Sequence, residues 1–102
     1  MKNFKELLIW QKGVEIAIKT FRLTEAFPRE DKFGLCSQMT RAAIASNIAE
    51  GISRTSQKDY SRFIEIALGS TSELETQLTI AEKLNKGDQK LLSELKANIT
   101  EE

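Results

Sequence analysis

Apolar residues recur along this chain at steps of three and four, the spacing that places them on one face of an α-helix. Four stretches show this pattern, and the predicted helices span residues 4–26, 34–54, 57–85 and 88–100. Pro28 ends the first helix because the residue before proline avoids helical geometry. Ser56 and Asp88 are suitable N-caps for the third and fourth helices. Since short connections favour antiparallel neighbours, we expect an all-α fold, an antiparallel up-and-down four-helix bundle with a short fourth helix.

The third predicted helix carries the most regular apolar seam. Its members alternate four and three residues apart, and they are Tyr60, Ile64, Ala67, Thr71, Leu74, Leu78 and Ala81. At 1.5 Å per residue this helix should be on the order of 43 Å long, whereas the fourth should be roughly 20 Å. The fourth helix therefore covers about half of the groove left by the other three. A partner fills the remainder, or the fourth helix frays, or the natural chain is longer.

The first two predicted helices each carry apolar residues on two faces. On the first helix, the stripe that we expect to face the core comprises Leu7, Trp10, Val14, Ala17, Ile18 and Phe21. A second stripe lies roughly 150° away, and the isoleucines of the second helix likewise lie opposite its expected core face. A helix that is apolar on two faces is buried on two faces, so we predict self-association. The predicted oligomer interface comprises Ile9, Ile16, Leu23, Ile44 and Ile48. The alternative is that these are scattered surface residues, which are common.

Polar residues lie among the small residues that line the second and third helices. We expect four of them to form a structural cluster: Arg41, Asn47, Glu50 and Glu73. Buried charges must be paired, so Arg41 or Arg54 should neutralise Glu50 or Glu73. Such a cluster fixes helix register more often than it performs chemistry.

The composition argues against an enzyme. The sequence has no histidine, which removes the commonest general base and the commonest metal ligand. Its single cysteine, Cys36, builds neither a disulfide nor a structural zinc site. We interpret Cys36 as a small core residue, and a thiol with a lowered pKa is the alternative. No phosphate-binding loop or nucleophile elbow occurs, so we expect no catalytic site, no metal and no cofactor.

The chain of 102 residues suits one domain, spanning residues 1–102. No stretch approaches the roughly 20 apolar residues that a membrane span needs, and the first residues lack a signal-peptide core. Together with the lone cysteine, this favours a cytoplasmic protein without a membrane partner.

Charge is balanced overall but unevenly spread. Residues 1–54 carry nine Lys or Arg and six Asp or Glu, and residues 55–102 carry six and nine. The predicted nucleic-acid-binding residues lie on one stripe of the first helix, where lysines repeat every seven residues: Lys5, Lys12, Lys19 and Arg22. Lysines spaced in this way can follow a row of phosphates. An ordinary solvated face is the alternative.

Several segments resemble a known family. They are LLIWQKG (7–13), FP (27–28), GLCSQMTRAA (34–43), SNIAEG (46–51) and GSTSELETQL (69–78). Together they resemble the four-helix-bundle proteins encoded by intervening sequences in bacterial 23S ribosomal RNA genes. The resemblance implies an antiparallel bundle that assembles into a homopentamer. The chain is also similar to the accessory variability proteins of diversity-generating retroelements, which partner a reverse transcriptase and bind nucleic acid through basic surfaces.

These observations lead to one hypothesis and one rival. The hypothesis is a non-enzymatic, self-assembling helical scaffold that binds RNA or DNA, or a nucleic-acid enzyme such as a reverse transcriptase. The rival is a protein–protein adaptor without nucleic-acid contact, in which the open groove beside the short fourth helix receives a partner helix.

Overall fold

The computed structural model describes residues 4–40 and 44–100, and within these ranges every regular element is helical. The elements in chain order are η1 (Phe4–Glu6), α1 (Leu8–Glu25), η2 (Arg29–Asp31), η3 (Lys32–Cys36), α2 (Ser37–Thr40), α3 (Ile44–Ser53), α4 (Gln57–Lys83) and α5 (Gln89–Thr100). The segments η1 and η2 are 3₁₀ turns, and η3 is π-helical. The structure confirms the predicted all-α class, and the ends of α1, α4 and α5 lie within four residues of the predicted ends.

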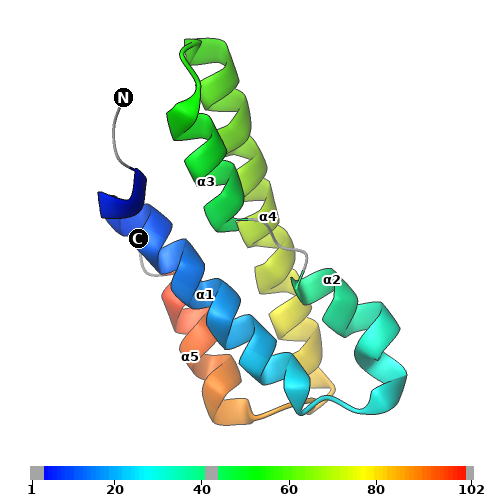
Figure 1. Ribbon diagram of the computed structural model, residues 1–102. Coiled ribbons are helices and arrows are strands. Elements are labelled where there is room, and N and C mark those ends of the chain that lie inside the picture. The colour runs from blue at the N-terminus through cyan, green and yellow to red at the C-terminus, as the bar shows by residue number, and fades with distance from the viewer. Residues whose placement is uncertain (1–3, 41–43, 101–102) are drawn as a thin grey trace.

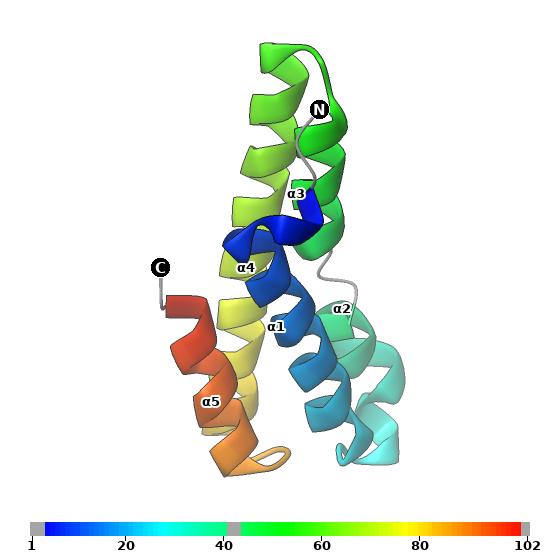
Figure 2. The ribbon, with the colours of Figure 1, turned by 60° about the vertical axis from the view of Figure 1, so that its left-hand side comes forward.

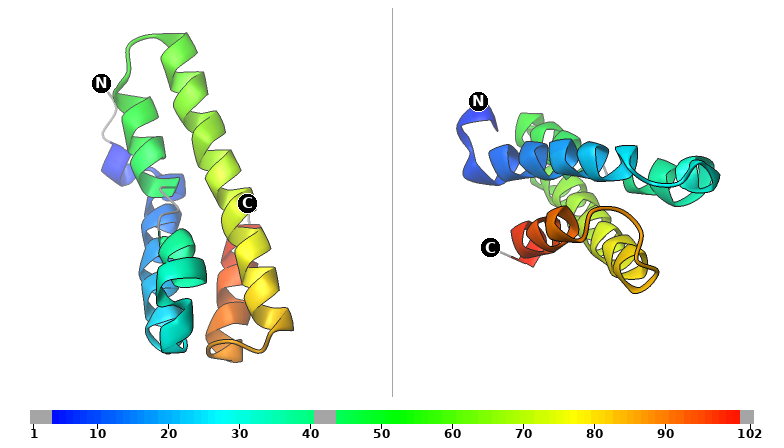
Figure 3. Two further views of the ribbon diagram at one scale, coloured as in Figure 1. Left: turned by 90° about the vertical axis from the view of Figure 1, so that its right-hand side faces the viewer. Right: turned by 90° about the horizontal axis from the view of Figure 1, so that it is seen from below.

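The helices form an elongated bundle of 43 × 22 × 18 Å whose longest member is α4 (Figure 1). α3 runs antiparallel beside the N-terminal half of α4, and α5 runs antiparallel beside its C-terminal half (Figure 3). α1 contacts both α3 and α5 and so connects the two halves (Figure 2). The arrangement confirms a four-helix bundle with a short last helix. No helix within the described ranges is both long enough and apolar enough to cross a membrane.

The N-terminal ends of α4 and α5 are capped by the residues that the sequence predicts as N-caps. Ser56 Oγ accepts a hydrogen bond from the Asp59 amide at 3.3 Å, and Asp88 Oδ1 accepts one from the Lys90 amide at 2.9 Å. Each cap satisfies an amide that has no partner inside its helix. Between the two helices, Gly87 has a φ of +80°, a conformation that side-chain-bearing residues rarely adopt. A Cβ on Gly87 would also lie 2.5 Å from Phe27 Cε1, so this turn requires glycine.

The most deeply buried face of α1 is not the predicted one, although Trp10 of the predicted stripe does pack against the core. Ile18 and Phe21, expected in the core, are 48% and 55% exposed, whereas Ile16 and Leu23 are buried. The remaining buried residues of α1 are Gly13, Thr20 and Thr24. Counting apolar residues found this face but assigned it to the outside, because Gly13, Thr20 and Thr24 add no hydrophobicity to it. Thr20 satisfies its own hydroxyl, because Oγ1 donates to the Ile16 carbonyl at 2.7 Å.

A close approach between α1 and α3 explains the choice of face. A Cβ on Gly13 would lie 3.2 Å from both the Cα and the Cβ of Ala45, which is tighter than ordinary contact. Only the Gly13 side of α1 therefore lets the two backbones come this close. The same contact turns the isoleucines of α3 inward, so Ile44 and Ile48 are buried and Ser46 is exposed. The predicted outward position of Ile16, Leu23, Ile44 and Ile48 is wrong, and only Ile9 is exposed.

The most deeply buried side chains gather where α1, α2, α4 and α5 surround one another. The largest are Leu23, Met39, Leu74, Leu78, Leu92 and Leu95. The predicted seam of α4 is confirmed, because each of its members is buried or half-buried. At this end an ion pair between Asp31 and Lys86 joins the connection after α1 to the turn before α5.

Candidate docking groove

A large apolar groove lies beyond the C-terminal end of α5, between α1, α3 and α4. Its volume is about 440 Å³. The residues that line it are Leu8, Ile9, Lys12, Gly13, Ile16, Ile44, Ile48, Ile64, Ala67, Leu68, Thr71, Asn98 and Ile99. A cavity of this size and composition falls in the usual range for ligand and docking sites.

The groove follows from the unequal lengths of α4 and α5. α4 has 27 residues and α5 has 12. At 1.5 Å per residue, roughly 22 Å of α4 extends past the end of α5. The N-terminal part of the α4 seam, Ile64 to Thr71, therefore lines a groove instead of packing against a fourth helix. Leu68 stands at its wall with 56% of its surface exposed, although a leucine is usually buried.

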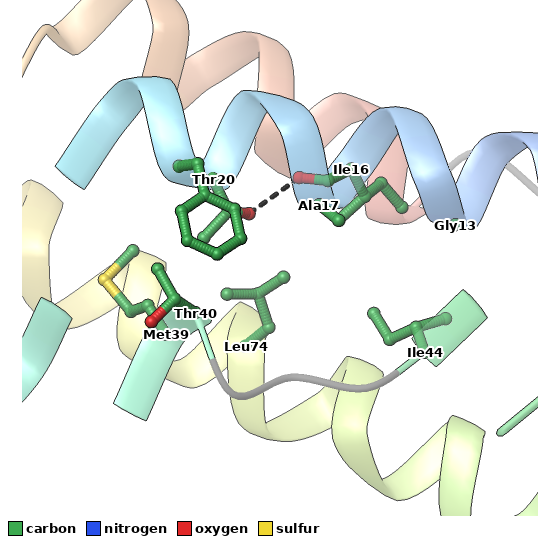
Figure 4. Close-up of a pocket in the computed structure, with 9 residues that line it drawn as sticks. Gly13, Ile16, Ala17, Thr20, Met39, Thr40, Ile44 and Leu74 are labelled. Atoms are coloured by element: carbon green, nitrogen blue, oxygen red, sulfur yellow. Dashed lines mark hydrogen bonds between the residues drawn. The ribbon is translucent and has the colours of Figure 1, made fainter. Parts of the chain in front are cut away.

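A second hollow, near the middle of α1, shows what a closed part of the same bundle looks like (Figure 4). It has a volume of about 10 Å³, room for about one water molecule. Ile16, Thr20, Met39, Ile44 and Leu74 approach it from four helices, and the Thr20 hydroxyl turns back to the Ile16 carbonyl. This hollow is a packing defect of the core, whereas the groove is wide enough for a helix or an organic ligand.

Most of the residues predicted to form an outer oligomer interface line this groove instead. Ile9, Ile16, Ile44 and Ile48 all line the groove, three of them as its floor. Leu23 lies away from it in the closed core. The sequence therefore predicted which residues share an apolar surface but placed that surface outside the bundle.

The predicted basic stripe does not form one uniform surface. Lys5 and Arg22 are exposed, whereas Lys12 is half-buried at the rim of the groove. Lys19 Nζ donates to Asn98 Oδ1 at 2.7 Å and lies 3.2 Å from Glu15 Oε1, so α5 and α1 both hold it. Two of the four residues are thus part of the groove and of the α5 contact.

The predicted polar cluster is distributed over separate helices. Glu50 is exposed on α3 and forms an ion pair with Arg54, the residue that directly follows this helix. Glu73 is exposed on α4, where its Oε1 accepts a hydrogen bond of 3.4 Å from Gln77 Nε2. Asn47 is half-buried, and Arg41 lies outside the described residues. Of the alternative pairings expected, the one between Glu50 and Arg54 is present, but it joins α3 to the residue directly after it and does not link two helices.

Cys36 is buried, as the sequence predicts for a core residue. Burial raises the pKa of its thiol above the usual value, although the nearby Lys32 acts in the opposite direction. A raised pKa keeps the thiol protonated and poorly nucleophilic at neutral pH. Within the described ranges, no three His, Cys, Asp or Glu side chains gather to hold a metal ion.

Comparison with family models matches residues 5–102 to the 23S rRNA-intervening sequence proteins. The chain belongs to this family. The match confirms the resemblance carried by segments such as SNIAEG (46–51) and GSTSELETQL (69–78). No curated protein matches the chain. Membership of the 23S rRNA-intervening sequence proteins agrees with the all-helical fold.

Sequence reasoning missed several groove residues. Leu8, Leu68 and Ile99 were not predicted as site residues, although each lines the groove. A signal did exist for Leu68, because it lies one residue from the seam position Ala67 and interrupts the polar face of α4. An unpaired leucine beside a heptad seam widens the apolar stripe, and a wide stripe indicates one further packing partner.

Proposed function

We propose that this member of the 23S rRNA-intervening sequence proteins is a non-enzymatic helical scaffold that acts by docking a helix of another polypeptide. The observation that carries the proposal is the groove, whose wall includes Leu68 at 56% exposure. Grooves lined by aliphatic side chains bind amphipathic helices by burying residues at i, i+3, i+4 and i+7. A single domain over residues 1–102 and the absence of a catalytic centre are part of this proposal.

The residues of α5 support a helix as the occupant. Leu92, Leu95 and Ile99 are spaced three and four apart, and all are buried against the same helices that wall the groove. Ile99 belongs both to this contact and to the groove lining. A helix that continues the line of α5 therefore meets the same kind of surface.

A synthetic amphipathic helical peptide of about 15 residues, with neutral flanks, tests the docking proposal. Fluorescence anisotropy of the labelled peptide should show saturable binding, and Leu68→Asp should weaken it about tenfold or more, because a carboxylate would be buried. Ile80→Asp is the matched control, since Ile80 is an exposed isoleucine of α4 outside the groove. Equal binding by both variants and the parent chain would reject the groove as the docking site.

Self-assembly into a homo-oligomer, for which the family resemblance suggests a pentamer, is a further proposal. The exposed apolar residues on the outer side of α1, Ile18 and Phe21, support it. Light scattering at high concentration should give a mass several times that of the 11.5 kDa chain. A mass of one chain under these conditions would contradict self-assembly.

Direct contact with RNA or DNA, or with a nucleic-acid enzyme such as a reverse transcriptase, is the second candidate function. The exposed Lys5 and Arg22 support it, together with the positive surplus of residues 1–54. Binding of structured RNA should then fall steeply with salt, and replacing Lys5, Lys12 and Lys19 by glutamate should abolish it. Retention of RNA by that triple variant in a gel shift would exclude this surface. We favour docking because Lys19 already contacts Asn98.

A further inference from the structure

The crossing of α1 and α3 lies between the groove and the small hollow in the core. Three residues line both spaces, the groove of about 440 Å³ and the hollow of about 10 Å³: Gly13, Ile16 and Ile44. Figure 4 shows Gly13 and Ile44 at one end of the hollow, with Thr20 and Met39 at the other. The two spaces are therefore neighbours, and the contact between α1 and α3 is the wall that separates them.

This wall has no room for one more methyl group. A Cβ on Gly13 would lie 3.2 Å from the Cα and Cβ of Ala45 and 3.3 Å from its backbone nitrogen. Since two of these three atoms belong to the backbone of α3, no change of rotamer relieves the contact. The helices would have to part by a few tenths of an ångström. Glycine at position 13 therefore sets the separation of α1 and α3 at the floor of the groove.

The floor and the walls of the groove differ in how far they can adapt to an occupant. The wall residues Leu8, Ile9 and Leu68 are more than half exposed, and exposed side chains change rotamer readily. The floor residues Ile16 and Ile44 are 7% exposed and belong to the close-packed core. The groove can thus adjust its width, whereas its depth is fixed by the contact between α1 and α3.

We infer that Gly13 is a specificity-determining residue of the groove: it keeps α1 against α3 and so restricts the central anchor of a docked helix to an aliphatic side chain. The inference rests on the proposed docking function and names the anchor that this site accepts. Below the floor there is room for about one water molecule, so a larger aromatic anchor overpacks it. Parting α1 from α3 would join that space to the groove and admit the larger anchor.

Two neutral helical peptides of about 15 residues, which differ only in a central leucine or tryptophan, test this role. Fluorescence anisotropy should show that the parent chain binds the leucine peptide about tenfold more tightly. Gly13→Ala should reduce this preference to about threefold or less. Alanine favours a helix over glycine by about 1 kcal/mol, which offsets part of the strain, so the variant should fold. Circular dichroism checks its helix content.

A rescue and a control accompany this variant. Adding Ala45→Gly to Gly13→Ala should restore part of the preference, because it removes one of the atoms that the new methyl group meets. Gly69→Ala is the matched control: Gly69 lies outside the groove, and a Cβ there meets nothing within 4 Å. It should leave the preference for leucine unchanged.

The outcomes separate this inference from the docking proposal. An unchanged preference in Gly13→Ala, or an equal loss of affinity for both peptides, overturns the role of Gly13 and leaves docking in place. Equal binding of the two peptides by the parent chain also overturns it, provided that Leu68→Asp still weakens both. Failure of both peptides to bind the parent chain overturns docking and this inference together.

Discussion

The two halves of α4 carry one continuous seam but meet different neighbours. In the C-terminal half, Leu74, Leu78 and Ala81 are at most 1% exposed, and α5 packs beside this half. In the N-terminal half, α3 covers one side only, and Leu68 stands in the wall of the groove. We call these halves the closed end and the open end. The difference shows that the seam determines which residues face inward, while the length of the neighbouring helix determines whether they are covered.

The largest effect is expected at the closed end, in the turn before α5. Gly87→Ala should lower the free energy of unfolding by about 4 kcal/mol, because the positive φ is strained and the new Cβ meets Phe27. Urea unfolding followed by circular dichroism measures it. Gly69→Ala is the control on α4, where a Cβ meets nothing within 4 Å, and it should be neutral or stabilise by about 0.5–1 kcal/mol.

Paired leucine truncations compare the two ends directly. Leu95→Ala should cost about 3 kcal/mol, because Leu95 is fully buried and its removal leaves a cavity. Leu68→Ala should change stability by less than about 0.5 kcal/mol in the isolated chain, because Leu68 already meets water. Equal losses from the two substitutions in thermal unfolding would mean that the open end is covered in solution.

Hydrogen exchange sharpens the same comparison without a mutation. Amides in the N-terminal half of α4 should exchange about tenfold faster than those in its C-terminal half, since fewer buried contacts oppose local opening there. Adding the neutral helical peptide should slow exchange at the open end and leave the closed end unchanged. Uniform protection along α4 in the chain alone would remove the distinction between the two ends.

The smallest expected effect concerns pH. The hydrogen bond to Asp31 raises the pKa of Lys86 above its usual value. The stabilisation that the protonated Lys86 gives to the folded state is therefore complete below the unfolded pKa of about 10.4. This stabilisation is lost as pH rises through the higher pKa of the folded state. Lys86→Met should therefore lower the melting temperature slightly at pH 7, and the gap to the parent chain should close in strongly alkaline buffer. A gap that widens with pH would contradict this sign.

Much of the fold could be predicted because local signals and packing agree. Ser56 and Asp88 were identified as caps from their residue type and position, and both accept the expected amide bonds. The heptad spacing of the α4 seam gave its inward face correctly. The shortness of the last helix followed from counting residues, and with it the existence of an uncovered groove.

The orientation of α1 could not be predicted in the same way. Its two faces have similar apolar content, and the decision depends on Gly13, which contributes no hydrophobicity but allows contact with Ala45. Buried threonines on the same face look polar in the sequence, yet Thr20 satisfies its hydroxyl within its own helix. A backbone contact between helices distant in sequence therefore outweighed the hydrophobic pattern, and this error placed four interface residues outside when they lie inside.

The ring pair at the beginning of the chain gives this molecule a built-in optical reporter. The ring centroid of Trp10, the sole tryptophan of the sequence, lies 5.4 Å from that of Phe4 in an edge-to-face arrangement. The indole also packs against the buried core, so loss of that packing changes the polarity around it. Emission from Trp10 can therefore report unfolding of the core in the unlabelled, unmutated protein.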